Sequence, residues 1–128
     1  MKIGIVGSRN FSNLTKLEEY MSKLPKDTII VSGGGGKVDK KAEEIAKRLG
    51  FKTEIYPADW NNLTHPDAVI KVNKFGKKYD ANAGHRRNEQ IAIASDKIVA
   101  FWDGKSPGTA STLRFATKHN KPYEIIRP

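Results

Sequence analysis

The sequence contains no cysteine, which excludes disulfide bonds and zinc sites built from thiolates. It has no apolar run close to the roughly 18–20 residues that a membrane-spanning helix needs, and Lys2 to Gly7 are typical of a strand, unlike a signal peptide. The histidines stand at positions 65, 85 and 119, without metal-ligand spacing, and neither a carboxylate pair nor a Ser–His–Asp arrangement is evident. We therefore expect a cytoplasmic protein with no metal, no cofactor and no membrane partner.

The chain has 128 residues, which suits one domain spanning residues 1–128. Lysine and arginine number 23 against 14 acidic residues, which gives a net charge of +9 at pH 7. Such a charge raises the local concentration of anionic partners, but it does not distinguish a nucleotide from a nucleic acid. Charge alone therefore leaves both classes of ligand open.

Short apolar segments alternate with segments in which apolar residues recur at helical spacing. The expected strands cover residues 3–6, 28–31, 51–56, 97–102 and 122–126, and the expected helices cover residues 14–24, 38–49, 84–94 and 109–118. Repeated strand–helix alternation indicates a parallel sheet with helices on both faces. The sequence therefore predicts the α/β class: a Rossmann-like three-layer domain with a mostly parallel sheet of about five strands.

The segment from residue 61 to residue 83 interrupts this alternation. It is polar and rich in lysine, at positions 71, 74, 77 and 78, and Ala68 to Val72 allow one short amphipathic helix. Connections of this length are usually functional or mobile. We interpret residues 61–83 as a basic flap that closes over the functional site.

Four consecutive glycines, Gly33 to Gly36, separate an expected strand from an expected helix. Each costs about 0.5–1 kcal/mol of backbone entropy relative to alanine, so the run costs about 2–4 kcal/mol. A glycine loop that leads into a helix directs N–H groups and the positive end of the helix dipole at an anion. The run matches neither GxGxxG nor GxxxxGK[ST], and a tight turn without a ligand is the alternative. We interpret the run as a phosphate-binding loop.

Ligands of such folds bind at the carboxyl ends of the strands, where the strand order reverses. Polar loops follow the first, second and fourth expected strands, and these loops converge if the three strands are neighbours. No catalytic residue can be assigned, although Arg87 is the choice if there is one. The candidate ligand-binding residues are Gly7, Ser8, Arg9, Ser32, Gly33, Gly34, Gly35, Gly36, Asp39, Asp59, Trp60, Arg87, Asn88, Asp103, Ser106, Gly108 and Thr109.

Several of these residues allow two interpretations. Arg9 and Arg87 can pair with a phosphate through two hydrogen bonds, or they can lie solvated on the surface. Thr109 can cap a helix, bind a phosphate, or do both. Asp39 can accept a hydrogen bond from a sugar hydroxyl, or it can be a favourable charge in the first turn of a helix. Trp60 can stack on a base or pack as part of a lid.

Five motifs follow one another along nearly the whole chain: Val6-Gly7-Ser8-Arg9-x-Phe11, Ser32-Gly33-Gly34-x-x-x-Val38-Asp39, Pro57-Ala58-Asp59-Trp60, Ala83-Gly84-x-x-Arg87-Asn88 and Ala100-Phe101-Trp102-Asp103-Gly104-x-Ser106-x-Gly108-Thr109. In series they resemble the SLOG superfamily, in particular its small stand-alone branch related to YspA. The resemblance implies a Rossmann-like domain that binds a nucleotide or a nucleotide-derived ligand, which it senses, sequesters or processes.

The same superfamily contains the LONELY GUY phosphoribohydrolases, which cleave nucleoside monophosphates and have a signature similar to PGGxGTxxE. Arg87 matches an arginine of that family and Pro107-Gly108-Thr109 matches part of the loop, but Thr112 stands where the glutamate belongs. A carboxylate would assist cleavage of the sugar–base bond, so its absence weighs against hydrolysis.

The superfamily also includes DprA, which binds single-stranded DNA. The resemblance therefore implies a nucleotide-derived small molecule as the first expected partner. Phosphoribohydrolase activity and single-stranded nucleic-acid binding are the alternatives. A homo-oligomer is expected, with a dimer as the first guess.

Overall fold

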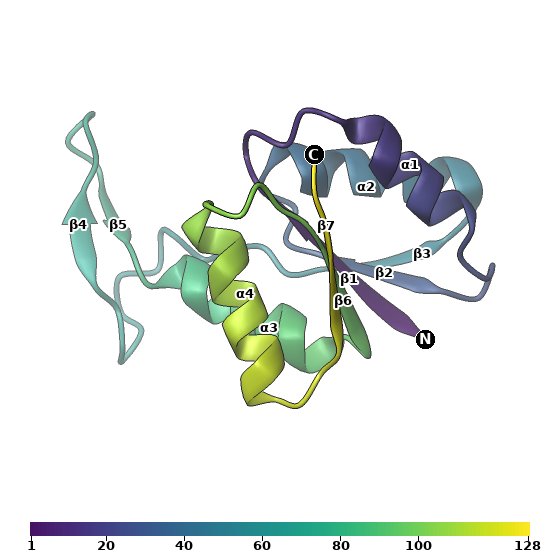
Figure 1. Ribbon diagram of the computed structural model, residues 1–128. Helices are drawn as coiled ribbons and strands as arrows, with labels where there is room; N and C mark the ends of the chain where they lie inside the picture. Colours follow the sequence, from purple (N-terminus) through teal and green to yellow (C-terminus); the bar gives the residue numbers. More distant parts are fainter.

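The strand at the centre of the fold is β1 (Lys2–Gly7), which has a parallel strand on each side. It is buried from Ile3 to Val6 because helices cover both faces of the sheet. The structure is a computed structural model that describes residues 1–128. Five parallel strands form one sheet in the order β3-β2-β1-β6-β7 (Figure 1), which confirms the predicted α/β class. The other elements of this layered body are β2 (Ile29–Ser32), β3 (Lys52–Ile55), β6 (Lys97–Phe101), β7 (Tyr123–Ile126), α1 (Leu14–Ser22), α2 (Lys37–Leu49), α3 (Ala83–Ala94) and α4 (Pro107–Lys118).

The order of the strands reverses beside β1. Gly4 of β1 pairs with Val31 of β2 on one side and with Ile98 of β6 on the other. β2 and β3 continue the sheet in one direction, and β6 and β7 continue it in the other. The carboxyl ends of β1, β2 and β6 therefore lie side by side, as predicted for the strands that precede the three polar loops.

Helices cover both faces of the sheet (Figure 1): α1 and α2 lie on one face, and α3 and α4 lie on the other. Thirteen buried apolar residues fill the first interface, among them Leu17 and Ile45, and seven fill the second, among them Ile91 and Leu113. Burial of one such side chain stabilises the fold by about 1.5–3 kcal/mol. None of the helices has the length and apolar character that crossing a lipid bilayer requires.

Residues 61–83 contain an antiparallel β-hairpin, so the expected short helix at 68–72 is wrong. β4 (Ile70–Val72) pairs with β5 (Lys78–Asp80), and Lys71 lies opposite Tyr79. β-Branched side chains in β4 favour a strand over a helix. The turn is closed by Asn73, whose side-chain oxygen accepts hydrogen bonds from the N–H groups of Phe75 at 2.9 Å and Lys77 at 3.0 Å.

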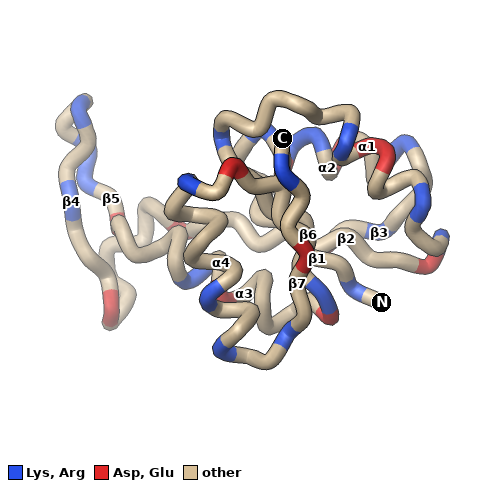
Figure 2. Tube along the Cα trace, viewed as in Figure 1, with Lys and Arg blue, Asp and Glu red and all other residues tan.

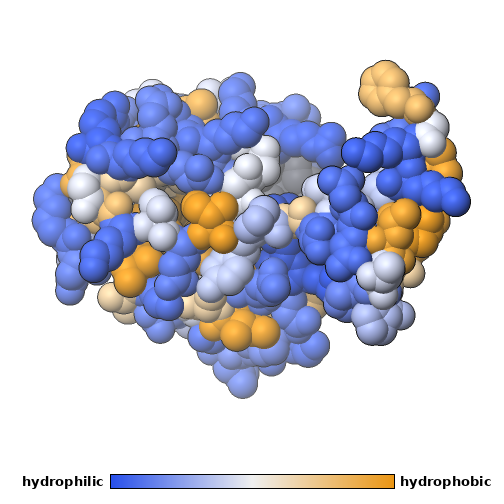
Figure 3. Space-filling model, turned by 180° about the vertical axis from the view of Figure 1, so that it is seen from behind, coloured by the Kyte–Doolittle hydropathy of each residue, from blue (hydrophilic) through white to orange (hydrophobic).

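The hairpin projects from the layered body of the protein (Figure 1). Basic residues lie along both of its strands (Figure 2), and its acidic residue Asp80 lies at the end of β5. Figure 3 shows apolar side chains exposed on the hairpin among hydrophilic ones. Of the hairpin residues, Val72 is 60% exposed and Phe75 is 82% exposed. The hairpin therefore presents both positive charge and apolar area to solvent.

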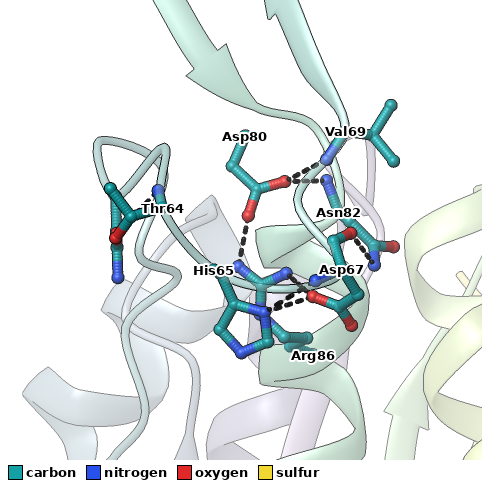
Figure 4. A network of polar contacts seen from close by, with 8 residues as sticks. Thr64, His65, Asp67, Val69, Asp80, Asn82 and Arg86 are labelled. Carbon is teal, nitrogen blue, oxygen red and sulfur yellow. Dashed lines mark hydrogen bonds and ion pairs between the residues drawn. The ribbon is translucent and has the colours of Figure 1, made fainter.

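A buried carboxylate fixes the base of the hairpin (Figure 4). Asp80 accepts hydrogen bonds from the N–H groups of Val69 at 3.0 Å and Asn82 at 2.9 Å, and it forms an ion pair with Arg86 at the start of α3. Arg86 also pairs with Asp67 at 2.6 Å. Burial alone would raise the pKa of Asp80, but the Arg86 guanidinium and the two N–H donors lower it to about 2. The charged network thus connects both ends of the hairpin to α3.

Candidate functional site

A cleft of about 500 Å³ opens at the carboxyl ends of β1 and β6, next to the first turns of α2, α3 and α4. A cleft at this edge of the sheet is expected where the strand order reverses. The predicted convergence of the loops after β1, β2 and β6 is present, but the loop after β2 contributes only its last residue. The predicted site residues that line the cleft are Gly7, Ser8, Arg9, Gly36, Asp39, Trp60, Arg87, Asn88, Ser106, Gly108 and Thr109.

Ser8 joins the loop after β1 to the loop after β6. Its hydroxyl donates to Asp103 Oδ1 at 3.1 Å and accepts from the Asp103 N–H at 3.0 Å. Asp103 Oδ1 also accepts from the N–H groups of Lys105 at 2.8 Å and Ser106 at 2.9 Å, and these backbone donors lower the pKa of Asp103. Asp103 does not line the cleft. It shapes the loop from which α4 begins.

The carboxylate of Asp39 lies against the glycine run. It accepts a hydrogen bond from the Gly35 N–H at 3.1 Å, and the Gly34 N–H lies 3.4 Å from the hydroxyl of Ser32. Burial raises the pKa of Asp39, although the hydrogen bond from Gly35 opposes that rise. Two N–H groups of the expected phosphate-binding loop therefore already have partners within the chain. Ser32, Gly33, Gly34 and Gly35 do not line the cleft.

Arg87 links the glycine run to the cleft. Its Nη1 donates to the carbonyl oxygen of Gly33 at 3.0 Å, and its Nε donates to Asn88 Oδ1 at 3.1 Å. The side-chain amide of Asn88 in turn donates to the carbonyl oxygen of Gly108 at 3.3 Å. These bonds hold the guanidinium in the cleft and leave its Nη2 without a protein acceptor. Arg87 can therefore offer that nitrogen to an anionic ligand.

The first turn of α4 supplies backbone donors to the cleft. Pro107 occupies the first turn of the helix, and Gly108 and Thr109 follow it. N–H groups in the first turn have no acceptor within the helix, and the helix dipole places partial positive charge there. The helix begins before Thr109, so the expectation that Thr109 caps it is wrong, because Ser106 holds the capping position. Thr109 is instead buried in the first turn, at the wall of the cleft.

An aromatic ring borders the cleft on the hairpin side. Trp60 is 42% exposed, and its ring lies over Gly84, where a Cβ atom would come within 2.9 Å of Trp60 Cη2. The ring of Tyr79 meets it edge to face, with centroids 6.3 Å apart. Asp59, the neighbouring candidate, does not line the cleft. The tryptophan therefore presents aromatic surface beside the polar wall.

Several lining residues were missed by the sequence-based prediction, among them Asn10, Ala81, Gly84, His85 and Pro107. The helical spacing of positions 84, 87, 88 and 91 places them on one face of α3, and that spacing was a usable signal. His85, expected at the surface, is exposed and its Nδ1 lies 3.0 Å from the Ser111 hydroxyl. No group of three or more His, Asp or Glu side chains in the chain is placed to hold a metal ion.

The charged groups of the cleft are unequal in number. Arg9 and Arg87 face a single carboxylate, Asp39, among the lining residues. Thr112 also lines the cleft, and its hydroxyl donates to the Gly108 carbonyl oxygen at 3.3 Å. The position expected for a hydrolase glutamate is therefore in the cleft but carries no carboxylate. The charged side chains that line the cleft therefore carry a net positive charge.

The fold and the cleft at its strand ends define a Rossmann-like α/β protein. Among solved structures, the chain is similar to DNA processing protein A (DprA) from Streptococcus pneumoniae, with a TM-score of 0.76 and 22% identity over 97% of this chain. It is also similar to DNA processing protein A from Helicobacter pylori, solved for its single-stranded DNA binding mode, with a TM-score of 0.67 and 22% identity over 98% of this chain.

The chain spans 49% of the Streptococcus structure and 64% of the Helicobacter structure. Neither a scan against protein-family models nor a search of curated proteins gives a match. The similarity therefore establishes a DprA-like fold, and the assignment to the YspA-like branch stays a prediction.

Proposed function

We propose that the chain binds single-stranded nucleic acid and holds one of its nucleotides in the cleft. The phosphate lies against the first turn of α4 and the guanidinium of Arg87, and the base lies against Trp60. The observation that carries this proposal is the combination, in one cleft, of unpaired cationic and backbone donors with an exposed aromatic ring. A phosphate and a base are the two chemical groups that such a cleft complements.

The phosphate end is supported by the donors that the protein leaves free. Nη2 of Arg87 and the N–H groups of Gly108 and Thr109, in the first turn of α4, have no acceptor in the chain. Hydrogen bonds between charged partners contribute about 1.5–3 kcal/mol each. In the glycine run, the Gly35 N–H already donates to Asp39. Of the glycine run and the start of α4, the start of α4 is therefore the better anion site.

The base end is supported by Trp60. Stacking of a base on an aromatic side chain is worth about 1–3 kcal/mol and does not depend strongly on sequence. The net charge of +9 attracts a polyanion more strongly than it attracts a single nucleotide, which carries fewer negative charges. The Helicobacter structure, whose fold this chain shares, was solved for single-stranded DNA binding, which supports the same class of ligand here.

A free nucleotide or nucleotide-derived molecule is the second candidate ligand. A volume of about 500 Å³ falls within the range of small-molecule sites, about 300–1,000 Å³. Asp39 can accept a hydrogen bond from a sugar hydroxyl in such a ligand. A protein of this kind would sense or sequester the nucleotide, and Thr112 weighs against its hydrolysis.

The test compares two probes: a fluorescein-labelled oligothymidylate, followed by anisotropy, and thymidine monophosphate, followed by thermal shift. We expect the oligonucleotide to bind more tightly, and we expect Arg87→Ala to weaken its binding about tenfold or more, equal to at least about 1.4 kcal/mol. Arg114→Ala is the matched control, because Arg114 is an exposed arginine of α4 outside the cleft. Binding of the mononucleotide alone would replace this proposal with the second candidate. Equal losses in the two variants would show that the cleft is not the site.

A further inference from the structure

A second hollow adjoins Trp60. It has a volume of about 360 Å³ and is lined by Trp60, Asn61, Asn73, Lys77 and Tyr79. Trp60 is the one residue that lines both this hollow and the cleft. Trp60 therefore borders two spaces, one lined by the start of α4 and the other by the hairpin.

The hairpin holds the walls of this hollow in place. The Asp80 N–H donates to the carbonyl oxygen of Trp60 at 2.8 Å, so β5 is fixed beside the tryptophan. Tyr79, the preceding residue, meets the Trp60 ring edge to face. On the turn, the Asn73 oxygen is taken by the N–H groups of Phe75 and Lys77, which leaves its amide NH₂ free as a donor. Lys77 forms no ion pair.

We infer that the hollow bounded by Trp60, Tyr79, Asn73 and Lys77 is a second nucleotide subsite, which takes the base next to the one held in the cleft. The inference rests on the proposed function. The base stacks against the aromatic walls, and the Asn73 amide donates to its edge. Lys77 meets the phosphate that joins the two nucleotides. Trp60 then lies between two consecutive bases of one strand.

The charge of the hairpin favours this occupant over an apolar peptide. Residues 71–79 contain four lysines and no acidic residue (Figure 2). Asp80, which follows them in the sequence, is engaged by Arg86 (Figure 4). Aromatic rings among lysines are typical of surfaces that bind single-stranded nucleic acid. A neutral peptide would form no ion pairs with these lysines. A single-stranded nucleic acid would bring one phosphate with each added base.

The experiment measures the affinities of thymidine monophosphate and of the dinucleotide pTpT for the full chain by calorimetry. Stacking of one extra base predicts that pTpT binds about tenfold more tightly than the monophosphate. Lys77→Ala should reduce that ratio several-fold and leave the monophosphate affinity unchanged, and Tyr79→Leu should also reduce the ratio. Lys71→Ala is the matched control, because it removes a lysine of the same hairpin that does not line the hollow. Lys77 is exposed, so its variant tests the subsite even if Tyr79→Leu unfolds the hairpin.

The outcomes separate this inference from the proposed function. If the monophosphate binds through Arg87 but pTpT binds no more tightly, the second subsite is refuted and the cleft stands. The same conclusion follows if Lys77→Ala and Lys71→Ala reduce the ratio equally. If neither probe binds, both proposals fail.

Discussion

Nη1 of Arg87 lies 3.0 Å from the carbonyl oxygen of Gly33, and a Cβ atom on Gly33 would lie 2.5 Å from that same nitrogen. The glycine therefore leaves room for an arginine of the protein itself. The absence of a side chain at Gly33 is therefore explained without any ligand. The run still matters for binding, because it determines where the guanidinium of Arg87 lies in the cleft.

The first prediction compares alanine at two glycines. Gly33→Ala should displace the Arg87 guanidinium and weaken oligothymidylate binding about tenfold, the loss of one charge-assisted hydrogen bond. Stability should change little, because the clashing atoms are the flexible end of a side chain. Gly35→Ala is the control, since Gly35 does not line the cleft and a Cβ there comes no closer than 3.5 Å to Arg87 Nη1. Anisotropy titration measures both, and equal affinities would contradict the role given to Gly33.

The sequence allowed the sheet to be predicted because strands buried on both faces appear as short apolar runs, as in Ile3 to Val6. It also allowed the candidate residues at the strand ends to be chosen, since loops at one edge of a parallel sheet converge. It could not show that Arg87 contacts Gly33, because the two residues are 54 positions apart. Nor could it show that the Asp39 carboxylate takes the Gly35 N–H, because that contact depends on the conformation of the loop.

The hairpin was missed for a different reason. A short apolar run such as Val69 to Val72 fits a strand and a helix equally well by periodicity alone. Two local signals favoured a strand: the β-branched residues of the run, and Gly76, which adopts φ of +78° in the turn. The network around Asp80 gave no signal, because it joins residues from both ends of the hairpin to α3.

The second prediction concerns catalysis. Purified protein should release little or no free base from nucleoside monophosphates, because Thr112 lines the cleft without a carboxylate to stabilise a cationic sugar or activate water. Chromatographic detection of adenine from adenosine monophosphate measures this. Rapid release that Arg87→Ala abolishes would establish a phosphoribohydrolase in place of a binding protein.

The third prediction concerns the stability of the hairpin base at low pH. The pKa of Asp80 in the folded chain is about 2, below its ordinary value near 4, so its charged form stabilises the hairpin base above about pH 4. That stabilisation is lost as the pH falls from about 4 to about 2. Hydrogen exchange should therefore show residues 67–82 opening in this interval. Asp80→Asn should open the segment already at neutral pH and remove this pH dependence. A pH profile unchanged by Asp80→Asn would assign the opening to another carboxyl, such as Asp67.

The fourth prediction concerns how the affinity for oligothymidylate depends on salt concentration. Single-strand binding loses affinity with salt at a slope of about 0.7 per phosphate contact on a logarithmic plot. Arg87→Ala and Lys77→Ala should each lower the slope for oligothymidylate by about 0.7, because each removes one proposed phosphate contact. Arg114→Ala should leave the slope unchanged. Anisotropy titrations at several salt concentrations measure it, and parallel plots for all four proteins would contradict both contacts.

The last prediction concerns residues 61–83 as a flap. The hairpin is held at its base by the Asp80–Arg86 network and by the contacts of Tyr79 and Asp80 with Trp60, whereas its turn forms hydrogen bonds only within the hairpin. We therefore expect the turn to move toward a bound oligonucleotide. Bound oligothymidylate should slow tryptic cleavage after the four lysines of residues 71–78, since the bound oligonucleotide then covers the hairpin and holds its turn in place. Mass mapping of limited digests, with and without saturating oligonucleotide, gives the rates at each lysine. Arg87→Ala at the same oligonucleotide concentration should show no protection, because the strand no longer anchors in the cleft. Equal cleavage with and without ligand in the parent chain would mean that the hairpin neither closes nor contacts the strand, and the flap interpretation would be wrong.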